Sequence, residues 1–134
     1  MRTKAEILSE ITASGFPGNE VAINMNDFFN NDNCIEGCFG GNGESPAKFY
    51  QAFKHLISSG LADQILVRIC DMEDSEEWFY TDTVYLIGSP SLEQLQASIE
   101  TLEPDEINEG WMYGKPFNVE DIKDGQKVYS LWWD

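Results

Sequence analysis

Hydrophobic positions recur at helical spacing in three segments of the chain, residues 3–14, 46–59 and 92–102. The middle segment is the clearest, because its apolar residues follow the i, i+3, i+4, i+7, i+8 pattern of an amphipathic helix. In the first and third, a Thr or Ser precedes a Glu or Gln by three residues, which is the spacing of a capping box. These patterns predict three helices, ended by glycine or proline.

Alternating or continuous apolar residues predict strands at Val21–Met25, Gln64–Cys70, Thr83–Ile87 and Val128–Trp133. A weaker signal at Cys34–Phe39 suggests a further short strand. The Thr83–Ile87 run is almost wholly apolar, so we expect both of its faces to be covered. All 134 residues then form a single α+β domain, a two-layer sandwich with about three helices packed on a mainly antiparallel sheet of five to six strands.

The charge balance restricts the possible partners. Eight basic residues stand against 24 acidic ones, for a net charge of −16. Nucleic acid and anionic lipid would be repelled, so we expect neither a nucleic-acid nor a membrane partner. A basic protein would be attracted and would associate faster. Half of the acidic residues lie between Arg68 and Lys115, where no Lys or Arg occurs. Solubility or adaptation to salt remains the alternative explanation for this acidity.

The three cysteines, Cys34, Cys38 and Cys70, do not suggest a disulfide framework, because their number is small and odd. We interpret them as reduced thiols in the core. The residues after Met1 contain no apolar signal segment, and no apolar run approaches the roughly 20 residues of a membrane span. These features favour a cytoplasmic protein.

Three segments contain residues typical of cofactor sites but lack the full pattern of any such site. Cys34 and Cys38 would need both Cys70 and His55 to complete a zinc site, which normally has four ligands in two pairs, and each of these two residues stands alone in the sequence. Residues 26–33 are rich in Asn and Asp but fit no register of an EF-hand loop. The glycines of residues 37–43 lack the Gly-Lys-Ser/Thr ending of a phosphate loop. We therefore predict no metal and no cofactor.

Catalysis is not favoured, although an enzyme that uses Cys, His or carboxylate chemistry remains an alternative. His55 is the single histidine and lies on the polar side of its predicted helix. A Cys-His pair requires proximity that the sequence does not show. Carboxylates are so numerous that their presence does not point to acid-base chemistry.

Aromatic residues stand among carboxylates in two segments, and we predict that these form a partner-binding surface. Aromatic side chains supply buried contact area, while carboxylates accept hydrogen bonds from Arg and Lys. The alternative is that each loop is solvated and its Trp folds back into the core. The predicted partner-binding residues are Asp71, Glu73, Asp74, Glu76, Glu77, Trp78, Tyr80, Asp82, Asp105, Glu106, Glu109 and Trp111.

The C-terminal part resembles small acidic bacterial α+β proteins of uncharacterised or toxin-immunity type. The resemblance rests on Asp82-Thr83-Val84-Tyr85, Ser91-Leu92-Glu93, Pro104-Asp105-Glu106, Glu109-Gly110-Trp111 and the ending Val128 to Asp134. It implies an immunity or inhibitor protein that sequesters a basic protein partner, such as a nuclease-type toxin. A housekeeping or regulatory adaptor with incidental acidity is the other reading of the same residues.

Overall fold

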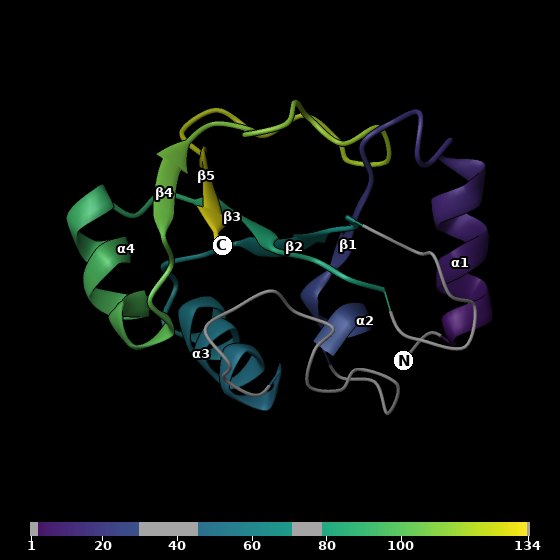
Figure 1. The fold of residues 1–134 in the computed structure, drawn as a ribbon. Coiled ribbons are helices and arrows are strands. Elements are labelled where there is room, and N and C mark those ends of the chain that lie inside the picture. Colours follow the sequence, from purple (N-terminus) through teal and green to yellow (C-terminus); the bar gives the residue numbers. More distant parts are fainter. Residues whose placement is uncertain (1–2, 30–45, 71–78, 134) are drawn as a thin grey trace.

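The computed structural model describes residues 3–29, 46–70 and 79–133 (Figure 1). Helices and strands are interspersed along the chain, and the longest helix lies in the middle. The elements are α1 (Lys4–Ala13), β1 (Ala22–Asn24), α2 (Met25–Phe29), α3 (Pro46–Ser58), β2 (Gln64–Arg68), β3 (Thr83–Gly88), α4 (Leu92–Ile99), the 3-10 helix η1 (Glu100–Leu102), β4 (Glu106–Glu109) and β5 (Lys127–Trp132).

The five strands form one antiparallel sheet in the order β1-β2-β3-β5-β4, so the predicted α+β fold is confirmed. β3 lies at the centre, and all six of its residues are buried, as its apolar run predicted. β1 and β4 are the two edge strands. The register places Thr83, Trp132 and Glu106 in one row across the sheet.

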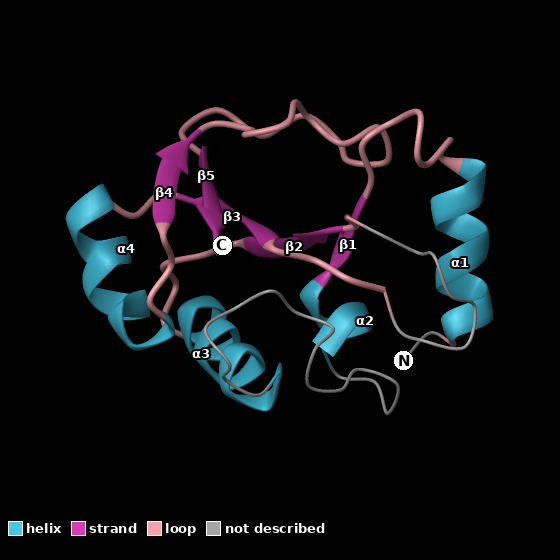
Figure 2. Ribbon diagram, in the orientation of Figure 1, coloured by secondary structure: helices cyan, strands magenta, loops and turns pink. Residues whose placement is uncertain are grey.

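All four α-helices contribute to the core on one face of the sheet, as Figure 2 shows. Ile7 and Ile11 of α1 and Phe49 and Phe53 of α3 are fully buried there. The ring of Trp133 packs edge-on against Phe49, with the ring centroids 5.4 Å apart, and its indole N–H donates to the carbonyl of Leu102 at 2.8 Å. Burial of such rings is the main driving force for folding.

The opposite face of the sheet is covered by the connection between β4 and β5, residues 110–126, which we call the strap (Figure 2). Trp111 and Val119 of the strap pack on a second apolar cluster. The members of this second cluster are Ala22, Leu66, Tyr85, Ile87 and Val128. The strap therefore covers apolar side chains on this face of the sheet, as the helices do on the opposite face.

Both predicted capping boxes are present, at the starts of α1 and α4. Two short elements differ from the prediction. The helix α2 forms where turns were expected, and the strand β4 forms within a segment described as turn-rich. The expected strand at Cys34–Phe39 lies outside the described residues. Leu92, assigned to the apolar stripe of its helix, is instead 44% exposed. None of the described helices has the length and apolar character needed to cross a membrane.

Candidate functional site

Half of the predicted partner-binding residues belong to a segment that the structure does not describe. These are Asp71, Glu73, Asp74, Glu76, Glu77 and Trp78. The remaining six can be placed. Tyr80, Asp82, Asp105 and Glu106 lie at or near one end of the sheet, Glu109 lies at the opposite end of β4, and Trp111 packs on the strap-covered face.

Three of the predicted carboxylate residues, Asp82, Asp105 and Glu106, meet at the end of β5. The backbone N–H of Trp133 donates to the carbonyl of Asp82 at 3.0 Å, and that of Asp105 donates to the carbonyl of Trp132 at 2.8 Å. Glu106 lies opposite Trp132 in the β4–β5 register. The fold thus brings Asp82 next to Asp105 and Glu106, which are far from it in the sequence.

The carboxylates at this end differ in what surrounds them. Asp82 is half-buried and accepts hydrogen bonds from the Thr83 hydroxyl at 2.8 Å and from the Cys70 thiol at 3.2 Å. Asp105 and Glu106 are exposed. The Asp82 carboxylate therefore stabilises the local fold through its hydrogen bonds, whereas Asp105 and Glu106 face solvent.

Exposed carboxylates continue from this end along one side of the molecule. We call this set the acidic edge, and it comprises Glu93 of α4, Glu100 and Glu103 around η1, and Asp105, Glu106 and Glu109 on or beside β4. Within this set, Glu109 forms an ion pair with Lys127, whose Nζ lies 3.8 Å from the carboxylate. Such exposed pairs neutralise little of the field.

The predicted aromatic residues are arranged differently from the carboxylates. Tyr80 is 38% exposed, beside Asp82. The Trp111 ring is half-buried and packs edge-on against Tyr85, with centroids 4.9 Å apart. Trp111 therefore belongs to the second apolar cluster and presents only part of its ring to solvent.

A polar cluster around Arg68 was not singled out by the sequence. The Arg68 Nε lies 2.5 Å from Glu20, its Nη1 lies 3.0 Å from the Cys70 sulfur, and its guanidinium carbon is 3.7 Å from the centroid of the Tyr113 ring. Burial raises the pKa of the Cys70 thiol, against the opposing effect of Arg68. Cys70 is therefore a neutral thiol near pH 7 and a poor nucleophile.

Tyr85 also borders this cluster. Burial raises the pKa of its hydroxyl, which is fully enclosed and makes no hydrogen bond to a described residue. The backbone N–H of Tyr113 faces the hydroxyl without reaching hydrogen-bonding geometry. This buried polar atom is an unfavourable feature of the second apolar cluster.

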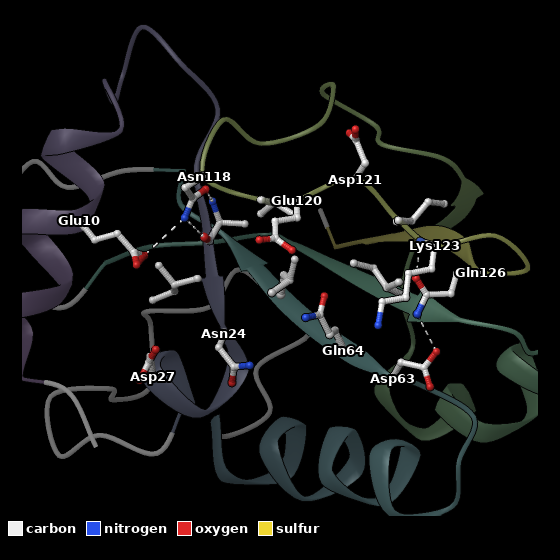
Figure 3. Close-up of a pocket in the computed structure, with 16 residues that line it drawn as sticks. Glu10, Asn24, Asp27, Asp63, Gln64, Asn118, Glu120, Asp121, Lys123 and Gln126 are labelled. Carbon is white, nitrogen blue, oxygen red and sulfur yellow. Dashed lines mark hydrogen bonds between the residues drawn. The ribbon is translucent and has the colours of Figure 1, made fainter.

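A groove of about 590 Å³ opens between the strap and the β1–β2 side of the sheet (Figure 3). Its floor comes from β1, β2 and β3, one end reaches Glu10 of α1, and the returning arm of the strap forms the opposite wall. Asn118 holds this arm in place, since its side chain accepts from the Ala22 N–H at 3.1 Å and donates to the Ala22 carbonyl at 2.6 Å. Nothing in the linear pattern indicated this groove.

The described residues do not support a metal centre or a Cys-His pair. No three Cys, His, Asp or Glu side chains among them gather closely enough to hold an ion. His55 is exposed near the C-terminal end of α3, close to where β2 starts, whereas Cys70 follows the far end of β2. The extended chain from Gln64 to Cys70 spans about 20 Å, so His55 and Cys70 do not form a pair. Cys34 and Cys38 lie outside the described residues.

Comparison with known protein families matches residues 2–131 to the Uncharacterized protein YfbO family. The chain belongs to that family. The match confirms the resemblance to uncharacterised proteins and carries no toxin-immunity assignment. Neither a curated protein nor a solved structure matches this YfbO-family chain significantly.

Proposed function

We propose that this YfbO-family protein is an acidic binding protein of the immunity or inhibitor type, which sequesters a basic protein partner. The observation that carries the proposal is the acidic edge. Its carboxylates are all exposed, and they lie on consecutive elements, from α4 through η1 to the edge strand β4.

The local charge balance supports attraction of a cationic surface. Between α4 and β4 the chain contains no Lys or Arg, so the field of these carboxylates is compensated only from other segments. Clustered charges of one sign raise the association rate with an oppositely charged partner. A toxin that binds nucleic acid has such a cationic face, and the carboxylates would occupy the positions of phosphates.

The exposed edge strand offers a second mode of contact. β4 pairs with β5 on one side and ends the sheet on the other. A strand from a partner can add to such an edge, with alternating side chains giving specificity. Glu106 and Glu109 on β4 would then select a strand with basic residues.

The proposal is tested by affinity capture with the purified protein at low and high salt. We expect the captured partner to be basic and its yield to fall steeply as salt rises. The double variant Asp105→Asn, Glu106→Gln should lose capture, whereas Asp121→Asn, Asp124→Asn should keep it. Both pairs remove two exposed negative charges, so the comparison separates position from net charge.

The opposite results point to the adaptor reading. Capture that is unchanged by salt and by the Asp105, Glu106 double variant would contradict an electrostatic mechanism. A captured partner with a net negative charge would contradict it as well.

A further inference from the structure

The groove beneath the strap combines an apolar floor with a polar rim. Ala22, Leu66 and Ile87 contribute apolar surface from the sheet, and Val119 and Ile122 contribute it from the strap. The charged and amide side chains stand around this surface. They include Glu10, Asp63, Asn118, Glu120, Asp121 and Lys123.

The carboxylates of the rim are not equivalent. Figure 3 shows the Glu120 carboxylate turned toward the sheet, over the groove, and the neighbouring Asp121 carboxylate turned away from it. Asp121 instead lies 3.7 Å from Lys115. Glu120 has no ion pair within the described part of the chain. Adjacent residues of equal charge therefore differ in whether they face the groove.

The two ends of the groove carry further carboxylates held by amides. At one end Glu10 accepts from the Asn118 amide at 3.4 Å, and at the other Asp63 accepts from the Gln126 amide at 2.9 Å. A neutral amide donates a hydrogen bond but adds no positive charge to the carboxylate that accepts it. The groove therefore has negative charge at both ends and in the middle.

Among the described residues that line the groove, Lys123 is the basic one. Figure 3 shows its side chain extending from the strap toward the sheet. The chain thus already places one lysine side chain in this space, with the ammonium group among carboxylates and amides.

We infer that the groove binds lysine or arginine side chains from an extended segment of a basic protein partner. A lysine or arginine side chain matches both surfaces, because its aliphatic stem packs on apolar residues while its cationic head bonds to carboxylates. The volume lies within the range of small-ligand sites and admits more than one such side chain. The inference rests on the proposed function and assigns part of the partner's contact to the strap side of the sheet.

The test uses capped hexalysine as the probe, at about 20 mM salt, where screening is weak. Binding is followed by amide chemical shifts in ¹H–¹⁵N spectra of the full chain and by fluorescence anisotropy of the labelled peptide. We expect the largest shifts at Gln64, Leu66 and Glu120, which line the groove.

Three matched variants locate the interaction. Glu120→Gln should weaken hexalysine binding about fivefold. This factor corresponds to the loss of about 1 kcal/mol from one solvent-accessible charge pair. Asp121→Asn should change it less than twofold, although the net charge changes equally. Lys123→Met should strengthen binding about threefold, because it removes a competing cation.

Equal weakening by the Glu120 and Asp121 variants would overturn the inference, as would tighter binding of spermidine than of hexalysine, which would assign the groove to a small polyamine. Shifts confined to the acidic edge would overturn the groove assignment while supporting the proposed function. No hexalysine binding anywhere at low salt would contradict both.

Discussion

Removal of the Tyr85 hydroxyl should stabilise the protein, although the residue is fully buried. The hydroxyl makes no hydrogen bond to a described residue, and its burial costs about 1–3 kcal/mol in lost solvation. Tyr85→Phe keeps the ring that packs against Trp111. We expect the free energy of unfolding to rise by about 1 kcal/mol.

Tyr129 supplies the matched control on the neighbouring strand. It is also buried, but its hydroxyl donates to the carbonyl of Pro90 at 3.0 Å. Tyr129→Phe removes this hydrogen bond and leaves the Pro90 carbonyl without this donor. The free energy of unfolding should therefore fall by about 1 kcal/mol. The same chemical change thus acts with opposite sign at two buried tyrosines.

The measurement is equilibrium urea denaturation followed by tryptophan fluorescence, with the slope of unfolding free energy against urea compared between variants. Because Tyr85 and Tyr129 belong to clusters on opposite faces of the sheet, the double variant should show additive effects. A loss of stability in Tyr85→Phe similar to that in Tyr129→Phe would refute the reasoning, since it would mean that the Tyr85 hydroxyl has a favourable partner.

Three further predictions concern the packing of the sheet. In Gly88→Ala the added Cβ would lie 2.6 Å from the Leu61 carbonyl oxygen, so thermal denaturation should show a loss of about 2 kcal/mol. Asn118→Ala removes both bonds to Ala22 and should speed amide hydrogen exchange in the strap by at least fivefold, while exchange in β3 stays unchanged. The raised pKa of Cys70 means that the folded chain keeps this proton after the unfolded chain has lost it, so stability should fall as the pH rises above 9.0. Cys70→Ala should flatten that fall in urea titrations across the alkaline range, and an unchanged slope would contradict the assignment.

Local signals in the sequence were sufficient for most of the regular elements. The capping pairs Thr3–Glu6 and Ser91–Gln94 act within one helical turn, so the sequence shows them directly. The apolar run of β3 indicated its burial on both faces, and alternation placed Trp133 on the same face as Tyr129 and Leu131. Only the structure shows that this face is the one packed in the core. These predictions depend only on neighbours along the chain.

Short elements were missed for the same reason. α2 has five residues and β4 has four, so each is too short for its hydrophobic pattern to be recognised in the sequence. β4 is specified by pairing with β5, where Ile107 lies opposite Leu131. Leu92 matched the helical stripe, yet it is the first residue of α4 and its side chain is exposed.

The sequence by itself determined that the protein is acidic, where helices α1 and α4 start, and that the fold is α+β with a mainly antiparallel sheet. It could do so because composition needs no structure and because periodicity and capping are short-range. Where the carboxylates gather was decided only by tertiary structure. Asp82 meets Asp105 through β5, and Asn118 binds Ala22 across 96 positions of the chain to create the groove. Such contacts depend on strand order and on the path of the strap, which no local pattern encodes.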